Sequence, residues 1–346
     1  MTECGDASTF DAVPKDRRWL LPLVCAAGAA GAACGGPFPQ STLRPRSDLA
    51  VATDQLFTDI FWWAVLVFIL VEGLLLFVVL RYRQRAGAPP PRPTHGHTVL
   101  EIAWTLAPAL ILVFIAVPTM RTIFATQAAA PAGALRVAVV GHQWWWEYRY
   151  PDFGIVTANE LHLPAGRPVS LELTSADVIH SFWAPGLGGK RDVIPGRTNH
   201  LVLSADSVDT FLGQCAEFCG ASHANMRLRV MVDRDSVFQT WVRAQQAGAA
   251  PVATGSAAEQ GQQAFRRYGC IGCHTMGTMS SATVGPNLTH VGSRTTIAAG
   301  LFPNDSAHLA RWIGDPPGEK PGAAMPNMHV PPPDLAALIA YLRSMR

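Results

Sequence analysis

Charged residues are scarce in this chain of 346 residues, and neither sign predominates. Asp, Glu, Lys and Arg together make up 15% of the sequence, and the formal net charge is only +2. A nucleic-acid-binding protein needs a basic surface to neutralise phosphates, so this balance argues against nucleic acid as a partner. Hydrophobic residues reach 49%, which favours a membrane protein instead.

Cysteine is also sparse. Of the seven cysteines, four fall into two short motifs, and the remaining three, Cys4, Cys25 and Cys34, lie near the N-terminus. The leftover cysteines do not form an even set, so a disulfide scaffold is not expected. The four clustered cysteines point to metal or cofactor binding.

The N-terminus has the pattern of an export signal. Arg17 and Arg18 precede an apolar, Ala- and Gly-rich run over 19–33 that is too short to span a bilayer comfortably. We predict that residues 1–33 are a bacterial signal peptide. Cys34 ends a sequence that resembles a lipoprotein cleavage box, so it is a candidate for lipidation. Ordinary signal cleavage and an uncleaved third helix are the alternatives.

Two apolar runs follow within an N-terminal segment over 34–125. They cover about 60–80 and 100–118, the length that a helix needs to cross the hydrocarbon core. The loop between them carries four arginines and no acidic residue before position 101: Arg81, Arg83, Arg85 and Arg92. Such a loop is expected in the cytoplasm, which places everything after Arg121 on the outer side of the membrane.

Short β-like runs characterise residues 134–233. Gly, Pro and Asn separate them, which indicates a small antiparallel sandwich or barrel. The runs cover 135–140, 161–163, 169–173, 200–203 and 227–232.

Soft metal ligands gather at the end of this region. Cys215, Cys219, His223 and Met226 fall within one short segment that Gly and Ala interrupt, so we expect a loop. Thiolate and thioether ligands favour copper, and a weak Met ligand is typical of electron-transfer copper rather than zinc. His180 is the candidate for a further imidazole ligand; the alternative for it is a packed core histidine.

A second motif lies beyond a linker. Residues 244–258 are rich in Ala, Gln, Gly, Pro and Ser, and they are expected to tether a C-terminal unit over 259–346. That unit contains Cys270, Cys273 and His274 in a Cys-x-x-Cys-His arrangement, which attaches c-type haem covalently and supplies an imidazole to the iron. A zinc site or a redox Cys pair is the alternative.

Two methionines downstream are candidates for the sixth iron ligand. Met325 and Met328 both lie in the segment before the terminal helix, which is expected over 334–344. A His and Met pair leaves no open position on the iron, so this unit would carry electrons rather than bind oxygen.

The copper motif resembles subunit II of the haem–copper cytochrome c oxidases. The similarity rests on Cys-x-Glu-x-Cys-x3-His-x2-Met, on the His-Ser-Phe-Trp-Ala-Pro sequence from His180 and on the segment 190–197, and it runs from the apolar helices to about Val232. With the C-terminal unit added, the chain resembles the caa-type oxidases, in which cytochrome c is fused to subunit II. The resemblance implies a two-helix transmembrane hairpin, an all-β cupredoxin-like domain and an all-α class I cytochrome c domain.

The resemblance also implies the cofactors. The first is a binuclear copper centre, Cu(A), although the spacing alone does not show two coppers. Two cysteines would bridge the coppers, two histidines would each ligate one, a methionine would bind weakly and a glutamate would contribute its carbonyl: Cys215, Cys219, His180, His223, Met226 and Glu217. The Glu217 carboxylate is implied to bind magnesium at the junction with subunit I, with a salt bridge to an Arg as the alternative.

Three further residues take roles from the resemblance. Trp144 matches the aromatic residue through which electrons arrive from cytochrome c; the alternative is an aromatic that fills the core or an interface. Glu101 matches an acid near the mouth of a proton pathway into subunit I, and the alternative is a helix cap. Met325, followed by Pro326, fits the axial-ligand pattern of cytochromes c better than Met328 does.

The expected function is electron transfer within a proton-pumping cytochrome c oxidase of the bacterial inner membrane. Electrons would pass from the fused haem through Cu(A) to subunit I, which holds the oxygen site on another chain. Subunits I and III and either cytochrome c or complex III are the expected partners. The alternatives are a Cu(A) subunit of a nitric oxide reductase, a copper-delivery module and a non-redox quinol oxidase subunit; this last class lacks the copper ligands present here.

Overall fold

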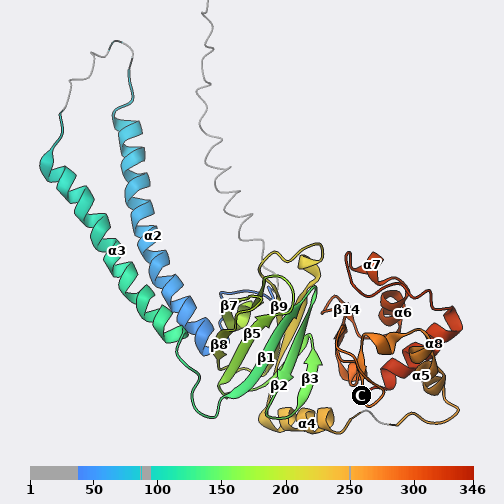
Figure 1. The fold of residues 1–346 in the computed structure, drawn as a ribbon. Helices are drawn as coiled ribbons and strands as arrows, with labels where there is room; N and C mark the ends of the chain where they lie inside the picture. Colours follow the sequence, from blue (N-terminus) through green and yellow to red (C-terminus); the bar gives the residue numbers. More distant parts are fainter. Residues whose placement is uncertain (1–37, 86, 88–94, 249–250) are drawn as a thin grey trace, which may run out of the picture. The chain divides into compact units, whose positions relative to one another are not determined.

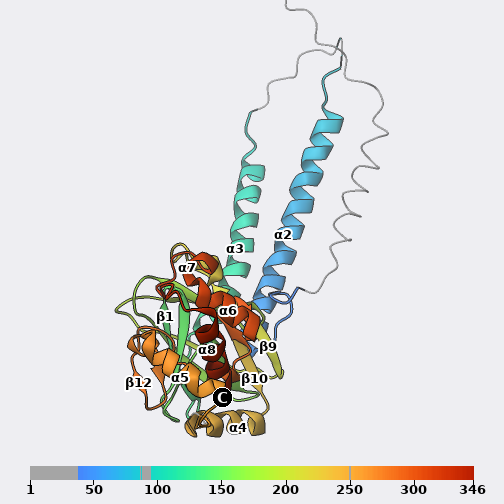
Figure 2. The same ribbon diagram turned by 90° about the vertical axis from the view of Figure 1, so that its right-hand side faces the viewer.

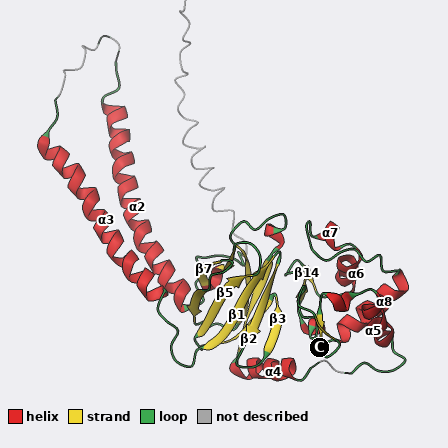
Figure 3. Ribbon diagram, viewed as in Figure 1, coloured by secondary structure: helices red, strands yellow, loops and turns green. Residues whose placement is uncertain are grey.

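The computed structural model describes residues 38–85, 87, 95–248 and 251–346. The predicted signal peptide and Cys34 lie outside these residues. Along the described chain, two long helices are followed by a strand-rich region and then by a mainly helical one (Figure 3).

The two long helices form a hairpin. Helix α2 (Asp48–Arg81) and helix α3 (Thr98–Thr126) run side by side in both views (Figures 1 and 2), and Trp63 stacks on Phe114 with ring centroids 5.7 Å apart. Both are long and apolar enough to cross a membrane, as predicted. They extend beyond the predicted bounds, because the prediction followed only the apolar runs. Helix α3 also continues through Pro118, which membrane helices tolerate.

The first turn of α2 is fixed to the strand-rich region. Ser47 caps the helix by accepting a hydrogen bond from the Ala50 amide at 3.0 Å, and its hydroxyl donates to the Leu187 carbonyl at 2.6 Å. The Asp48 carboxylate accepts from the Ser204 amide at 2.8 Å. Leu49 is buried in the neighbouring core. The outer end of the hairpin is therefore anchored by both polar and apolar contacts.

The strand-rich region, residues 135–233, is called the sandwich domain below. Its first sheet has the order β3-β2-β1-β5-β8, from β1 (Leu135–His142), β2 (Trp145–Tyr150), β3 (Ile155–Ala158), β5 (Val169–Ser175) and β8 (Asn199–Leu203). The second has the order β4-β10-β9-β6-β7, from β4 (Glu160–Pro164), β6 (His180–Ala184), β7 (Gly188–Val193), β9 (Asp209–Cys215) and β10 (Arg227–Asp233). All five predicted strands are confirmed, and five more are present.

The prediction of a purely antiparallel sandwich is wrong in one respect. Strand β1 pairs with β5 in parallel, and so does β10 with β4. Parallel neighbours require a crossover connection between them. Here the chain passes through the other sheet in each case: β4 of the second sheet lies between β1 and β5 in the sequence, and β5 and β8 of the first sheet lie between β4 and β10. One apolar core fills the domain, with Trp146, Tyr148 and Leu171 fully buried in it.

Helix α4 (Asp235–Gln246) follows the sandwich domain, and the connection to the next helix occupies residues 247–256. This is shorter than the predicted linker at both ends.

The remainder, residues 257–346, is called the C-terminal domain. It contains α5 (Ala257–Arg267), α6 (Ser306–Gly314), α7 (Pro316–Glu319) and α8 (Pro332–Ser344), with the short strand pairs β11 (Thr275–Met276) with β12 (Ser280–Ser281) and β13 (Thr296–Ile297) with β14 (Phe302–Pro303).

Helices α5 and α8 cross at very close range. A Cβ atom at Gly261 would lie 2.0 Å from the Ala337 carbonyl oxygen, so only glycine fits this crossing. Phe265, Leu338 and Tyr341 are buried beside it in a second core, separate from that of the sandwich domain. The two cores support the predicted division into two extramembrane domains.

Candidate metal centre and haem pocket

The structure brings the predicted copper ligands together at one end of the sandwich domain. The Sγ atoms of Cys215 and Cys219 lie 3.7 Å apart. His180 Nδ1 lies 3.9 Å from Cys215 Sγ, and His223 Nδ1 lies 3.6 Å from Cys219 Sγ. Met226 Sδ is 3.8 Å from Cys219 Sγ. Two sulfur atoms at the centre thus have one imidazole on each side.

Glu217 contributes its backbone rather than its side chain to this cluster. Its carbonyl oxygen lies 3.2 Å from Cys215 Sγ. The side chain is exposed, and it forms no salt bridge within the described part of the chain. The predicted carbonyl contact is therefore consistent with the geometry.

The two thiols share their protons unequally. Hydrogen bonding between the two sulfur atoms lowers the pKa of Cys215 and raises the pKa of Cys219. Two thiolates, two imidazoles and a thioether form a soft donor set that fits copper.

Asp177 orients one of the imidazoles, a role that the sequence analysis missed. Its Oδ1 atom lies 2.7 Å from His180 Nε2, which turns Nδ1 towards the sulfur atoms. Burial lowers the pKa of His180, but the hydrogen bonds with Cys215 and Asp177 raise it overall. A second carboxylate oxygen of Asp177 accepts from the Gln143 amide at 2.6 Å. The available signal was a carboxylate three residues before a ligand histidine, since metal-binding imidazoles commonly donate to one.

Trp144 contacts the loop that carries the candidate metal ligands, residues 215–226. Its indole Nε1 donates to the Cys219 carbonyl at 3.0 Å, and Gln143 Nε2 donates to the same oxygen at 2.7 Å. The indole is 9% exposed and lies against Gly220 of the loop. Trp144 belongs to the core cluster of the sandwich domain and also lies beside the metal ligands.

A cavity of about 360 Å³ lies between the C-terminal domain and the sandwich domain, and its lining includes Cys270, Cys273, His274 and Met325. His274 Nδ1 lies 2.8 Å from the Pro286 carbonyl, which leaves Nε2 as the free ring nitrogen. Burial lowers the pKa of His274, so the neutral form that binds metal is favoured. The cavity and its donors fit a haem held by two thioethers and an imidazole.

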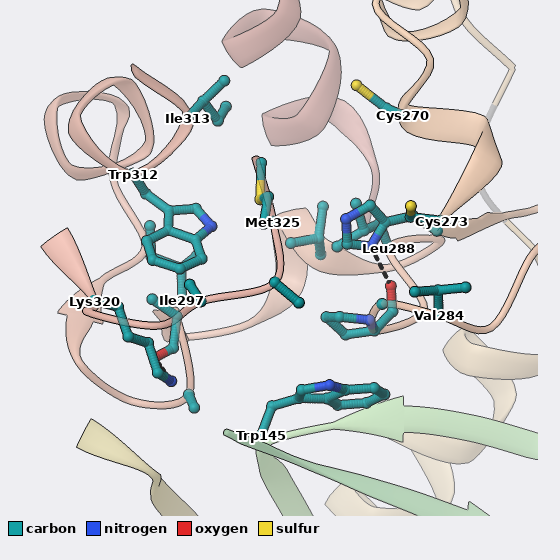
Figure 4. Close-up of a pocket in the computed structure, with 18 of the residues that line it drawn as sticks. Trp145, Cys270, Cys273, Val284, Leu288, Ile297, Trp312, Ile313, Lys320 and Met325 are labelled. Carbon is teal, nitrogen blue, oxygen red and sulfur yellow. Dashed lines mark hydrogen bonds between the residues drawn. The ribbon is translucent and has the colours of Figure 1, made fainter. Parts of the chain in front are cut away.

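Both candidate methionines line this cavity, but they differ in exposure. Met328 is 38% exposed, whereas Met325 is partly buried. Figure 4 shows the Met325 side chain within the pocket, between Trp312 and the two cysteines, with Trp145 of the sandwich domain along another wall. Met325 is the better placed of the two.

Glu101 is not part of either site. It lies in the first turn of α3, exposed, about 38 Å along the helix from Thr126 at the usual rise per residue. His97 caps this turn by accepting from the Leu100 amide at 3.4 Å.

Three family models cover most of the chain. The cytochrome c oxidase subunit II transmembrane domain matches residues 44–122, its periplasmic domain matches residues 154–233, and cytochrome c matches residues 258–346. These matches confirm the predicted three-part fold, and they imply copper and haem. They do not favour the predicted alternatives of a nitric oxide reductase subunit or a copper-delivery module.

Curated relatives agree over nearly the full length. The chain is 39% identical to cytochrome c oxidase subunit 2 of Alkalihalophilus pseudofirmus over 288 residues, which cover 81% of this chain and 83% of the relative. It is 32% identical to the Bacillus subtilis protein of the same name over 351 residues, 94% of this chain and 96% of the relative. The chain therefore belongs to the cytochrome c oxidase subunit II family, as an electron-transferring membrane subunit of a haem–copper oxidase that carries its own cytochrome c domain outside the membrane.

Proposed function

We propose that the cysteine cluster holds a binuclear Cu(A) centre and that the C-terminal domain holds covalent haem c, so that electrons delivered to the haem reach subunit I through copper. The observation that carries this proposal is the convergence of five ligand side chains and one carbonyl in a single cluster. When bound, each cofactor exchanges one electron at a time.

The chain's own residues would fix both groups in place. Copper would be held by the following six residues: His180, Cys215, Glu217, Cys219, His223 and Met226. Because Asp177 holds His180, and the paired strands β6 and β9 carry His180 and Cys215, these two ligands need little rearrangement when the charge changes. In the C-terminal domain, Cys270 and Cys273 would form the thioethers, and His274 and Met325 would be the axial ligands.

Trp144 is proposed as the residue through which electrons arrive at the copper. Its indole bonds to the carbonyl of Cys219 on one side. The ring also meets Gly322 of the C-terminal domain, three residues before Met325: a Cβ atom at Gly322, where φ is +81°, would lie 2.6 Å from Trp144 Cη2. A single aromatic side chain thus joins the two candidate sites.

The remaining roles concern partners. We propose that subunit I accepts the electrons, that subunit III belongs to the same complex, and that cytochrome c or complex III reduces the fused haem. The exposed Glu217 carboxylate is proposed to bind magnesium at the junction with subunit I, and the exposed Glu101 is proposed to lie near a proton pathway.

The substitution Cys219→Ser tests the copper assignment. Removing one bridging thiolate should abolish the mixed-valence copper spectrum, while the haem spectrum of the same preparation stays unchanged and acts as the control. The measurement is electron-spin and optical spectroscopy of the purified oxidase, with the metal content determined in parallel. A variant that keeps the mixed-valence signal would refute the bridging role.

A further inference from the structure

The sandwich domain and the C-terminal domain meet through two buried charged side chains. Glu160 belongs to the sandwich domain and Lys320 to the C-terminal domain, and each is 3% exposed. Neither takes part in a salt bridge among the described residues. A buried charge is costly unless hydrogen bonds compensate it, so the partners of these two groups indicate what they are for.

Glu160 is satisfied entirely from across the interface. Its Oε1 atom accepts from the backbone amides of Thr295 and Thr296 at 2.9 and 2.8 Å, and from their hydroxyls at 2.6 and 2.8 Å. Every side-chain hydrogen bond that Glu160 makes within the described chain comes from these two residues. Arg294, the residue before them, adds an attractive charge. If the domains separated, this carboxylate would lose all of these donors.

Lys320 bridges the two domains from the other side of the contact. Its Nζ atom donates to the Trp144 carbonyl at 2.6 Å and to the Ala298 carbonyl at 3.2 Å, one acceptor in each domain. Burial lowers the pKa of Lys320 to about 7. Lys320 lies on the segment that leads to Met325, at the edge of the haem pocket (Figure 4). It therefore joins the axial-ligand segment to the backbone of Trp144.

We propose that Glu160 and Lys320 are positioning residues that latch the C-terminal domain onto the sandwich domain, with the haem pocket held against Trp144. This inference rests on the proposed function, because it concerns the pose in which one electron would pass from the reduced haem, oxidising it, to the copper site, reducing it. The latched pose also covers Trp144. Soluble donors then deliver electrons to the haem, and they do not reach the copper site directly.

The experiment uses the complete oxidase with Glu160→Ala and Lys320→Met as separate variants. Glu172→Ala, an exposed acid of β5, and Lys190→Met, an exposed lysine, are the matched controls. For each variant, hydrogen–deuterium exchange is measured at interface amides that are not hydrogen-bonded to the substituted residue. For Lys320→Met these are the Thr295 and Thr296 amides; for Glu160→Ala it is the Arg227 amide, which donates to Ala299 across the interface at 3.1 Å.

Both latch variants are expected to lose protection at these amides, and the controls to keep it. After flash reduction of the haem, haem-to-copper transfer should slow by about tenfold or more, because the loosened contact no longer holds the haem pocket against Trp144. Direct reduction of copper by a soluble donor should become faster as Trp144 is uncovered.

Unchanged protection in both variants, or an unchanged transfer rate with both cofactors present, overturns the latch. Glu160 does not line the haem cavity, whereas Lys320 does. If Lys320→Met alters the haem spectrum, the result for Glu160→Ala alone is used to judge the latch. The exchange measurement needs no copper signal. If the wild-type oxidase lacks Cu(A), the proposed function fails and the latch is still judged by exchange.

Discussion

At the scale of single residues, the candidate copper site depends on a side chain that is not among the proposed ligands. Asp177 lies 2.7 Å from His180 Nε2 and fixes which ring nitrogen faces the sulfur atoms. Carboxylates of this kind are typically worth one to two orders of magnitude in metal affinity.

We expect Asp177→Asn to weaken copper binding by about 10- to 100-fold, because the amide cannot stabilise the imidazole in the same way. Competition with a copper chelator measures the affinity, and the haem spectrum should not change. Asp152→Asn is the matched control, since Asp152 pairs with Arg136 on the surface of the same domain. Equal affinities for both variants would contradict the positioning role.

Met325 and Met328 are distinguished by a second pair of substitutions. Met325→Ala should remove the thioether-to-iron absorption band and lower the haem reduction potential, because a thioether ligand raises that potential. Met328→Ala should leave the band in place, since Met328 is more exposed. The reverse result would assign the axial position to Met328.

At the scale of elements, the close crossing of α5 and α8 determines how the helices of the C-terminal domain pack. These helices come from opposite ends of that domain, and they touch at Gly261 without room for a Cβ atom. The Cys-x-x-Cys-His motif follows α5 directly, so the crossing also positions the proposed haem attachment site.

Gly261→Ala should therefore destabilise the C-terminal domain by about 1–3 kcal/mol, the usual cost of overpacking a rigid contact. Denaturant unfolding followed through the haem absorption measures this free energy. Gly314→Ala is the control, because a Cβ atom at Gly314 would meet nothing within 4 Å. Equal stabilities for the two variants would show that the helices can move apart at little cost.

At the scale of the whole molecule, two separate cores carry the two redox units. Helix α4 packs against the core of the sandwich domain through Phe238 and Val242, whereas the C-terminal domain has a core of its own. The chain thus keeps its electron donor on a short connection, which raises the donor's local concentration to about the millimolar range.

A chain ended after Gly248 should keep the copper spectrum, because the removed residues contribute nothing to the first core. In the assembled oxidase, oxygen consumption would then depend on added cytochrome c. Comparison with the full-length enzyme at several donor concentrations measures this dependence. Loss of the copper signal on truncation would show that the two domains fold as one unit.

The sequence by itself determined the parts and the chemistry of this protein. Long apolar runs and a loop rich in Arg specify a membrane hairpin, and fixed spacings of Cys, His and Met specify metal and haem ligands, because each depends on residues close together in the chain. Five strands were predicted correctly because a run of β-forming residues is also a local signal. Strands β2 and β6 were not predicted, because their residues were interpreted only as parts of the aromatic and copper-ligand motifs.

Only the tertiary structure decided which distant residues meet. Asp177 and His180 are only three residues apart, although the sequence analysis did not pair them. In contrast, Glu160 lies 135 residues from Thr295, and Lys320 lies 176 residues from Trp144. No periodicity or spacing encodes such pairs. They exist because two separately folded surfaces place a carboxylate opposite backbone amides and an ammonium group opposite carbonyls, which is a property of the docked domains and not of any segment.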